Sequence, residues 1–357
     1  MNKKRITFVM PHATNVPIGG YKAVYEFSNG LVERGHEVSV ILPWVMDPVP
    51  GIASAIKANI RPIMYRFRPP MKVTWFHVDP RVTLKIVSDL RQRWVPEADF
   101  VVATSWATAP FVSRYPARCG KKLYLLQHLE TFGGPHDEVV ATWKLPLQKL
   151  TIASWLSDFA KSLGESSIPV RVGVDLDEYG LDVPIAGRGN IVSMLYGDTA
   201  VKAGSDGLKA LGLVKRKVPD LKVRLFGNSE PPSLPDWMTY ERSVPSNRLR
   251  QIYNESSVFV HPSTAEGWPA PPAEAMACGA AVAACANPGV MDYAKPGITA
   301  ITSKPGDWAE LADSITTLLT DLNLRRTIAE AALEDVQQYS WKHAQSRFAE
   351  VIEQLSR

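Results

Sequence analysis

Short apolar runs of strand length alternate with helical patterns along this chain, and the alternation constrains its fold more than any other feature. Alternating strands and helices are typical of a mainly parallel sheet with helices on both faces. The apolar runs of the first half lie at Arg5–Met10, Glu37–Leu42, Phe100–Thr104, Leu123–Gln127 and Leu150–Ala153. We therefore predict an α/β domain in the first half of the chain.

Helical stripes separate these runs. Within Tyr21–Glu33, three apolar residues fall at i, i+3 and i+7, which places them on one face of a helix. Val82, Ile86 and Leu90 fall at i, i+4 and i+8, which also suits one helical face. Both segments are predicted to be helices.

The alternation stops and then restarts in the second half. Residues Gly173–Gly189 are rich in Gly, Pro and Asp, which is typical of a linker. Beyond them the pattern predicts strands and helices at Ile191–Tyr196, Ser205–Val218, Val223–Phe226, Asn247–Asn254 and Val258–Val260, and almost only helix from Asp307 onwards. A length of 357 residues suits two domains. We divide the chain into a first domain at 1–172, a linker at 173–190, a second domain at 191–338 and a C-terminal helix at 339–357.

Two glutamates eight positions apart carry the most functional information. Glu266 and Glu274 lie in the block His261–Gly279, which begins where an apolar run ends and finishes in an Ala-rich segment closed by a glycine. One carboxylate is expected on a loop at the carboxyl end of a strand, and the other in the first turn of the next helix. Ligands of open α/β sheets bind at such strand ends. The pair suits a ligand with hydroxyls, which donate to carboxylates, and phosphates, which accept from helix N–H groups.

This block resembles the E-x7-E motif of retaining glycosyltransferases with the GT-B fold, most closely glycosyltransferase family 4, the glycosyl transferases of group 1. The resemblance extends to the Gly19-Gly20 loop, His128, Gly173-Val174-Asp175, Lys202 and Tyr339-Ser340-Trp341. It implies an α/β fold of two Rossmann-like domains facing each other across a cleft, with the C-terminal helix crossing back to the first domain. The first domain would take the acceptor and the second the nucleotide-sugar donor.

The resemblance also implies roles for single residues. Glu266 would hold hydroxyls of the donor sugar, Lys202 would hold the donor's diphosphate, and His128 would lie beside the sugar and the acceptor. These three are the predicted catalytic residues. Glu274 would hold the nucleotide ribose. The other residues predicted to bind the donor are Gly19, Gly20, Gly227, Asn228, Val244, Gly267, Trp268, Pro269 and Ala270.

One position departs from the family's pattern. The lysine is usually preceded, about five residues earlier, by an arginine, and this chain has Tyr196 and Gly197 there. Losing one donor to the departing diphosphate typically costs on the order of 100- to 1,000-fold in rate. Three interpretations stay open: Lys202 and the helix amides suffice, another arginine substitutes, or activity is weak. The alternatives to an active transferase are a GT-B partner subunit without turnover and, less favoured, a sugar-nucleotide epimerase.

Composition limits the cofactors and substrates. The seven histidines do not cluster, so we expect no metal and no other cofactor. The donor would be UDP-, GDP- or dTDP-linked, and the acceptor a saccharide, a lipid-linked saccharide or a small molecule. Cys119, Cys278 and Cys285 have no metal-site spacing and suit buried thiols in a reducing cytosol.

Charge is unevenly distributed along the chain. Residues 1–172 hold 22 Lys and Arg against 13 Asp and Glu, whereas residues 173–357 hold 18 against 23. The excess concentrates in Arg61–Lys72, where it is interleaved with aromatic residues. Such a segment is either a solvated surface or a contact for anionic lipid headgroups. We expect a cytoplasmic protein with possible peripheral contact at the inner face of the membrane, and no nucleic-acid partner, because no recognition motif accompanies the charge.

Overall fold

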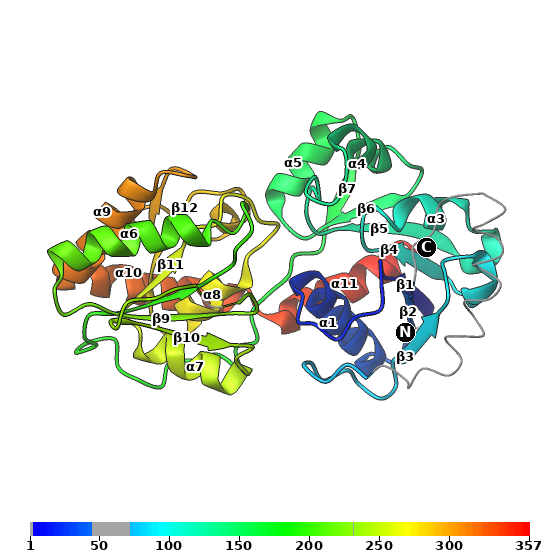
Figure 1. Cartoon of the computed structure of the whole chain (residues 1–357). Coiled ribbons are helices and arrows are strands. Elements are labelled where there is room, and N and C mark those ends of the chain that lie inside the picture. Colours follow the sequence, from blue (N-terminus) through cyan, green and yellow to red (C-terminus); the bar gives the residue numbers. More distant parts are fainter. Residues whose placement is uncertain (1–2, 45–71, 231) are drawn as a thin grey trace. The chain divides into compact units, whose positions relative to one another are not determined.

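The structure, a computed structural model, describes residues 3–44, 72–230 and 232–357. The chain divides into two compact units, one of Met1–Arg171 with Ala344–Arg357 and one of Val172–His343 (Figure 1). Residues 173–190 are therefore part of the second unit, and the end of the chain belongs to the first. Residues 61–71 of the basic segment lie outside the described residues.

The first unit is built on a parallel sheet with the strand order β3-β2-β1-β4-β5-β6-β7. β1 lies beside β2 on one side and β4 on the other, with Val9 opposite both Ile41 and Ala103. The strands are β1 (Arg5–Val9), β2 (Glu37–Pro43), β3 (Thr83–Val87), β4 (Phe100–Ala103), β5 (Lys121–Leu126), β6 (Gln148–Thr151) and β7 (Ser167–Pro169). The helices are α1 (Gly19–Glu33), α3 (Ala109–Arg114), α4 (His136–Trp143), α5 (Ser154–Ser162) and α11 (Trp341–Gln354), with single 3₁₀ turns at Gln92–Trp94 and Ala117–Cys119.

The C-terminal helix α11 packs into the first unit beside α1, as the resemblance implied. The ring of Phe348 stacks on Phe27 with centroids 4.5 Å apart, and it lies 5.9 Å from the ring of Phe8. Gly30 permits this close approach, because a Cβ there would lie 2.5 Å from the Cβ of Gln345. The predicted apolar stripe of α1 is therefore the face that α11 and the sheet cover.

The helix predicted at Val82, Ile86 and Leu90 is wrong. The segment forms strand β3, which pairs in parallel with β2. Its polar residues Thr83 and Lys85 are exposed while the apolar residues between and after them are partly or fully buried, which is a period of two. The same residues fit both the spacing of four of a helix and the alternation of a strand. The segment forms a strand because the edge of β2 offers it hydrogen-bond partners.

The second unit is a smaller parallel sheet with the order β10-β9-β8-β11-β12-β13. Its strands are β8 (Ile191–Leu195), β9 (Lys222–Gly227), β10 (Met238–Arg242), β11 (Val258–His261), β12 (Ala281–Cys285) and β13 (Ile301–Ser303). Its helices are α6 (Gly204–Lys217), α7 (Ser246–Glu255), α8 (Ala270–Ala277), α9 (Trp308–Thr320) and α10 (Leu322–Asp335), with single 3₁₀ turns at Val290–Asp292 and Val336–Gln338. Every strand pair is parallel, so the carboxyl ends of all six strands lie along one edge.

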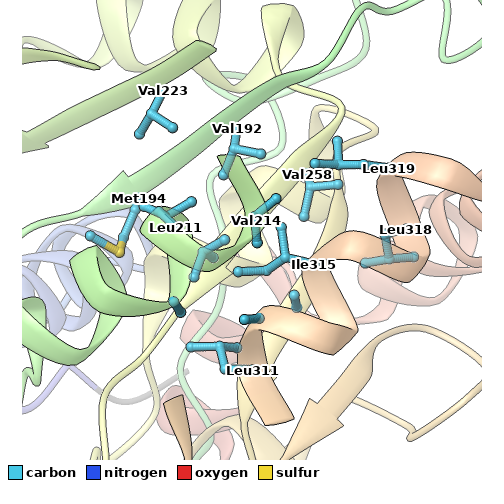
Figure 2. Packing of buried hydrophobic residues seen from close by; sticks show 14 of the residues in the cluster. Val192, Met194, Leu211, Val214, Val223, Val258, Leu311, Ile315, Leu318 and Leu319 are labelled. Atoms are coloured by element: carbon cyan, nitrogen blue, oxygen red, sulfur yellow. The ribbon is translucent and has the colours of Figure 1, made fainter. Parts of the chain in front are cut away.

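One face of this sheet and the helices α6 and α9 share an apolar core. Val192, Val223 and Val258 come from three strands and meet Leu211 of α6 and Ile315 of α9, all with 1% of their surface or less exposed (Figure 2). Burying such side chains stabilises a fold by about 1.5–3 kcal/mol each. This core fixes the strands whose ends carry the predicted site.

Three of the strands that the sequence patterns missed were missed for identifiable reasons. β12 has the sequence Ala-Val-Ala-Ala-Cys and is fully buried, so it lacks alternation and continues the Ala-rich composition of the helix before it. β7 and β13 are three residues long, which is too short for a periodic signal. The three cysteines are buried free thiols, as predicted.

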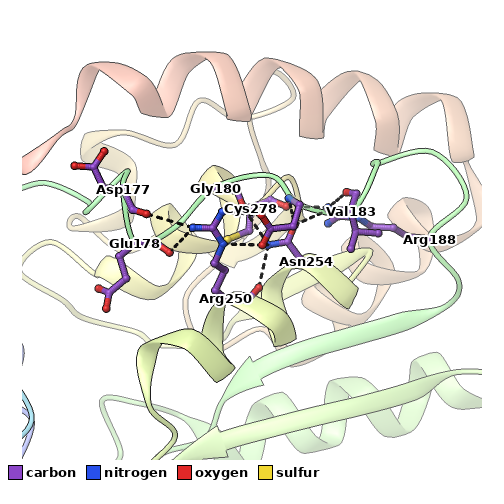
Figure 3. A network of polar contacts seen from close by, with 9 residues as sticks. Asp177, Glu178, Gly180, Val183, Arg188, Arg250, Asn254 and Cys278 are labelled. Atoms are coloured by element: carbon purple, nitrogen blue, oxygen red, sulfur yellow. Dashed lines mark hydrogen bonds and ion pairs between the residues drawn. The ribbon is translucent and has the colours of Figure 1, made fainter.

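The predicted linker is fastened to the second unit by three side chains (Figure 3). Arg250 forms two 2.6 Å bonds to the carboxylate of Asp182 and donates to the carbonyl of Glu178. Asn254 accepts from the N–H of Asp182 at 2.7 Å and donates to the carbonyl of Gly180. This segment forms no helix or strand, so side chains provide hydrogen-bond partners for many of its backbone N–H and carbonyl groups.

Arg188 completes this anchorage. Its buried guanidinium donates to backbone carbonyls only, and burial lowers its pKa to about 10. Two of these carbonyls follow the ends of α7 and α8, where helices leave carbonyls without intrahelical partners. The five acceptors are the carbonyl oxygens of Val183, Pro184, Tyr253, Ser256 and Cys278.

We predict that Arg188→Ala destabilises the second unit by about 3–5 kcal/mol, because it leaves several buried carbonyls without donors. Urea unfolding followed by circular dichroism measures this loss. Arg216→Ala, at an exposed arginine near the end of α6, is the matched control and should change the unfolding free energy by under about 0.5 kcal/mol. Equal effects of the two substitutions would contradict this account of the anchorage.

Candidate functional site

Glu266 and Lys202 meet at the point where the second sheet reverses its strand order. β8 has β9 on one side and β11 on the other, so the loops after β8 and β11 diverge to opposite faces of the sheet. Lys202 follows β8 and Glu266 follows β11, and Lys202 Nζ lies 2.7 Å from Glu266 Oε1. Ligands of open α/β sheets bind at such a reversal. The structure therefore brings together two residues that the sequence separates by more than sixty positions.

The Glu266 carboxylate is held in its charged form although it is mostly buried. Burial raises the pKa of Glu266, but the positive charge of Lys202 and the hydrogen bonds from Lys202 and Ser263 together lower it below its ordinary value. Its side chain is 14% exposed, whereas that of Lys202 is 38% exposed. A charged acceptor that still reaches solvent can receive hydrogen bonds from the hydroxyls of a ligand.

The space where the resemblance predicts an arginine is occupied. A Cβ on Gly197 would lie 2.9 Å from both Cβ and Cγ of Lys202, so the stem of that lysine lies against the glycine. No larger residue fits at 197 while Lys202 keeps this conformation. Tyr196 turns instead towards α6, because a Cβ on Gly204 would meet its ring at 2.9 Å.

Glu274 lies one turn deeper than predicted. α8 begins at Ala270, so Glu274 is its fifth residue and belongs to the second turn of the helix, not the first. Its carboxylate is buried and accepts a 3.1 Å hydrogen bond from the hydroxyl of Tyr253 on α7. A Schellman motif ends this helix as the sequence indicated, with Gly279 at φ +77° and the N–H of Ala280 bonded to the carbonyl of Ala275.

The loop between the two glutamates is fixed by aromatic packing. Trp268 is 7% exposed, and its ring lies 4.7 Å from that of Tyr293 and 6.2 Å from that of Tyr339. The Tyr293 hydroxyl donates to the carbonyl of Pro269 at 2.7 Å. Trp268 therefore serves as an anchor of the loop that carries Gly267 and leads into Ala270.

The remaining donor-binding candidates of the second unit lie at the ends of β9 and β10. Gly227 ends β9, and a Cβ there would lie 2.3 Å from the carbonyl oxygen of Tyr196, so the position requires glycine. The N–H of Ser243 donates to the carbonyl of Gly227, and its hydroxyl contacts the amide oxygen of Asn228 at 3.3 Å. The structure thus brings Asn228 and the turn before Val244 side by side.

In the first unit, His128 follows β5 and faces two aromatic rings. Its Nδ1 accepts the backbone N–H of Glu130 at 2.9 Å, and its ring makes edge contacts with Phe132 and Trp155. Gly20, the second residue of α1, lies near this strand end, since a Cβ there would lie 3.3 Å from the side chain of the neighbouring Gln127. A Cβ on Gly19 would meet nothing within 4 Å, so that glycine faces open space.

Sequence reasoning gave Glu130 no role, and the structure singles it out. Glu130 has φ +56°, a left-handed conformation that is unfavourable for a residue with a side chain. Its Oε2 accepts the backbone N–H of Trp106 at 2.6 Å, which ties the end of β5 to the end of β4. Burial raises the pKa of Glu130 to about 7. No sequence pattern predicts that a glutamate adopts a left-handed backbone conformation.

The described residues offer neither a metal site nor a membrane-spanning helix. Among them, no cluster of His, Cys, Asp and Glu has the arrangement to hold a metal ion. No helix within the same residues has the length and apolarity needed to cross a membrane.

Comparison with known proteins shows what this chain is similar to. Residues 200–335, which contain Lys202, Glu266 and Glu274, match the family model described as glycosyl transferases group 1. The chain is also 28% identical over 151 residues to the sulfoquinovosyl transferase SQD2 of Arabidopsis thaliana. That match covers 39% of this chain and 29% of the relative's length.

Solved structures show the fold over the whole chain. HepE of Anabaena, in complex with UDP and glucose, superposes with a TM-score of 0.76 at 15% identity, covering 98% of this chain and 100% of that one. Sucrose-phosphate synthase from Thermosynechococcus elongatus superposes with a TM-score of 0.75 at 16% identity, covering 99% of each chain. The chain therefore has the GT-B fold, with two Rossmann-like parallel sheets, as predicted.

We predict that Glu130→Gln changes how stability depends on pH. Because folding raises the pKa of Glu130 from an ordinary 4.5 to about 7, the folded state binds more protons between these values and loses stability as pH rises through them. The loss is at most about 3 kcal/mol, and the amide variant, which does not titrate, should not show it. Thermal unfolding from acidic to mildly alkaline pH tests this, with the exposed Glu138→Gln on α4 as control. Parallel pH curves for the wild type and Glu130→Gln would refute it.

Proposed function

We propose that the chain transfers a sugar from a nucleotide-sugar donor to an acceptor, with retention of configuration at the anomeric carbon. The observation that carries this proposal is the Lys202–Glu266 pair at the strand-order reversal of the second sheet. It lies inside the segment that matches glycosyl transferases of group 1. The pair combines a cation for phosphate with a charged acceptor for sugar hydroxyls.

Lys202 is assigned to the departing diphosphate. Negative charge grows on this group as the bond from the anomeric carbon to the phosphate oxygen breaks, and a positioned cation lowers the barrier. The new bond from the anomeric carbon to the acceptor oxygen forms on the same face, and the acceptor hydroxyl gives its proton to the departing diphosphate. Since Lys202 is more than one third exposed, it can move from Glu266 to a phosphate oxygen.

Glu266 is assigned to the sugar and Glu274 to the nucleotide ribose. Glu266 keeps its charge through Lys202 and Ser263, so it is ready to accept from hydroxyls. Glu274 already accepts from Tyr253, and a carboxylate has further acceptor positions for ribose hydroxyls. The turns at Asn228 and Val244 are assigned to the nucleotide base.

A uridine nucleotide is the first donor to test. HepE was solved with UDP and with UDP-glucose, and it shares the fold over 98% of this chain. We assign no metal to the reaction, since the lysine and the backbone amides provide the positive groups that the diphosphate needs. His128 is assigned to the first unit's part of the reaction, beside the reacting sugar.

One observation supports a second candidate function, that of a partner subunit without catalytic turnover. Tyr196 and Gly197 stand where the glycosyl transferases of group 1 usually have an arginine, so one donor to the diphosphate is absent. The stem of Lys202 fills that space, which favours the interpretation that the lysine and the amides suffice. Product analysis separates the two candidates.

We predict that the wild-type chain, given a panel of UDP-, GDP- and dTDP-sugars, forms a conjugate whose anomeric configuration equals that of the donor. Lys202→Met and Glu266→Gln should each lower kcat by on the order of 100- to 1,000-fold, while EDTA leaves turnover intact. NMR of the products reads both identity and configuration. The exposed Asp313→Asn on α9 is the control and should match the wild type. Free sugar or an epimer as sole product, or complete loss of turnover in EDTA, would contradict the proposal.

We predict that Glu274→Ala weakens nucleotide binding by on the order of 10-fold or more, because hydrogen bonds to a charged acceptor are worth about 1.5–3 kcal/mol. Calorimetric titration with UDP, GDP and dTDP measures it. Tyr253→Phe keeps the ring and removes the hydroxyl that donates to Glu274, so it tests whether this contact orients the carboxylate. Unchanged affinity for every nucleotide in Glu274→Ala would remove the ribose assignment.

A further inference from the structure

Asn287 lies two residues beyond β12, on a turn next to the Glu266 loop. Its side chain is completely buried and makes hydrogen bonds in three directions. Its Oδ1 accepts the N–H of Val290 at 3.0 Å, and its Nδ2 donates to the carbonyl of Ser263 at 2.9 Å. A buried amide with this many partners is expensive to misplace, because each lost bond leaves a polar group without water.

These two backbone partners fix which way the amide points. A backbone N–H can only donate and a carbonyl can only accept, so Val290 and Ser263 together place the amide oxygen and nitrogen of Asn287 without ambiguity. The same Nδ2 lies 3.2 Å from Nε2 of His261. Since the amide nitrogen must donate, Nε2 of His261 must accept, and a neutral His261 carries its proton on Nδ1.

His261 is in turn kept uncharged. It is 2% exposed, and burial lowers its pKa to about 4. The charged groups that act on its ring are Glu266, which favours the protonated form, and Lys202, which opposes it. A proton on Nε2 of His261 would point at the amide hydrogens of Asn287. This repulsion between two donors further disfavours protonation of the ring.

The turn that holds Asn287 also supports the backbone of Glu266. A Cβ on Gly289 would lie 2.5 Å from the carbonyl oxygen of Glu266, so this turn packs directly against the loop. Asn287 binds the same loop at Ser263, whose hydroxyl bonds to the Glu266 carboxylate. One buried side chain therefore supports both the position of Glu266 and the neutrality of its neighbouring histidine.

We infer that Asn287 is a positioning residue of the reaction: it orders the Ser263–Glu266 loop and holds His261 as a neutral acceptor, so that Lys202 is the only full positive charge of the described site that Glu266 meets. This rests on the proposed function in that Glu266 holds the donor sugar. A charged His261 would form an ion pair with Glu266 and compete with the sugar hydroxyls. Neutral His261 leaves the carboxylate available to the donor.

Three variants test the inference. Asn287→Asp has the same shape, but its carboxylate stabilises an imidazolium and loses the donor to Ser263. It should lower kcat/KM by on the order of 10- to 100-fold, as misplaced reactive groups do, and acquire a pH dependence near neutrality that the wild type lacks. His261→Gln offers Asn287 a neutral acceptor and should stay within about threefold of the wild type. Asn287→Asp/His261→Gln should lose the new pH dependence.

Histidine ¹⁵N NMR of the full chain gives a readout that needs no turnover. The wild type should show Nε2 of His261 as an unprotonated acceptor from mildly acidic to mildly alkaline pH, with His261→Gln used to assign the signal. A proton on Nε2, an imidazolium near pH 7, or a His261→Gln variant as impaired as Asn287→Asp would overturn the inference. If no nucleotide-sugar reacts while the NMR result holds, the proposed function fails and the placement of the proton stands.

Discussion

A carboxylate held away from water costs free energy unless charge and hydrogen bonds compensate, and Glu266 is such a carboxylate. Lys202 at 2.7 Å provides the charge and Ser263 provides a hydrogen bond. Breaking a mostly buried pair by removing one partner is costly, which makes the pair sensitive to everything that places its two loops. Gly197 and Gly289 are required at those loops because a side chain at either position would collide with Lys202 or with the backbone of Glu266.

The parallel sheet explains why these two loops meet. All strands of the second unit end at one edge, and the order reverses between β8 and β11. Core side chains such as Val192 and Val258 hold β8 and β11 in register. Packing several residues away therefore determines where the loops of Lys202 and Glu266 lie. Arg188 and Arg250 extend the same rigidity to the segment that enters the unit.

The sequence predicted the two parallel sheets, the long helices and the E-x7-E block, because these depend on local periodicity and on a motif with fixed spacing. Periodicity failed at Val82–Leu90, where two periods fit and only the neighbouring strand β2 decides between them. It also failed at β12, where complete burial removes alternation. The importance of Asn287 and of Glu130 could not be predicted, since one depends on partners far away in the chain and the other on a left-handed backbone.

Packing of α11 against Phe8 and Phe27 has a consequence for how the molecule is made. The ribosome synthesises this helix only after the whole of the second unit. Until then the N-terminal sheet lacks the helix that covers these two rings, so the apolar surface around Phe8 and Phe27 stays exposed during translation. Chaperones that bind exposed apolar surface would therefore bind the first unit before α11 has been synthesised.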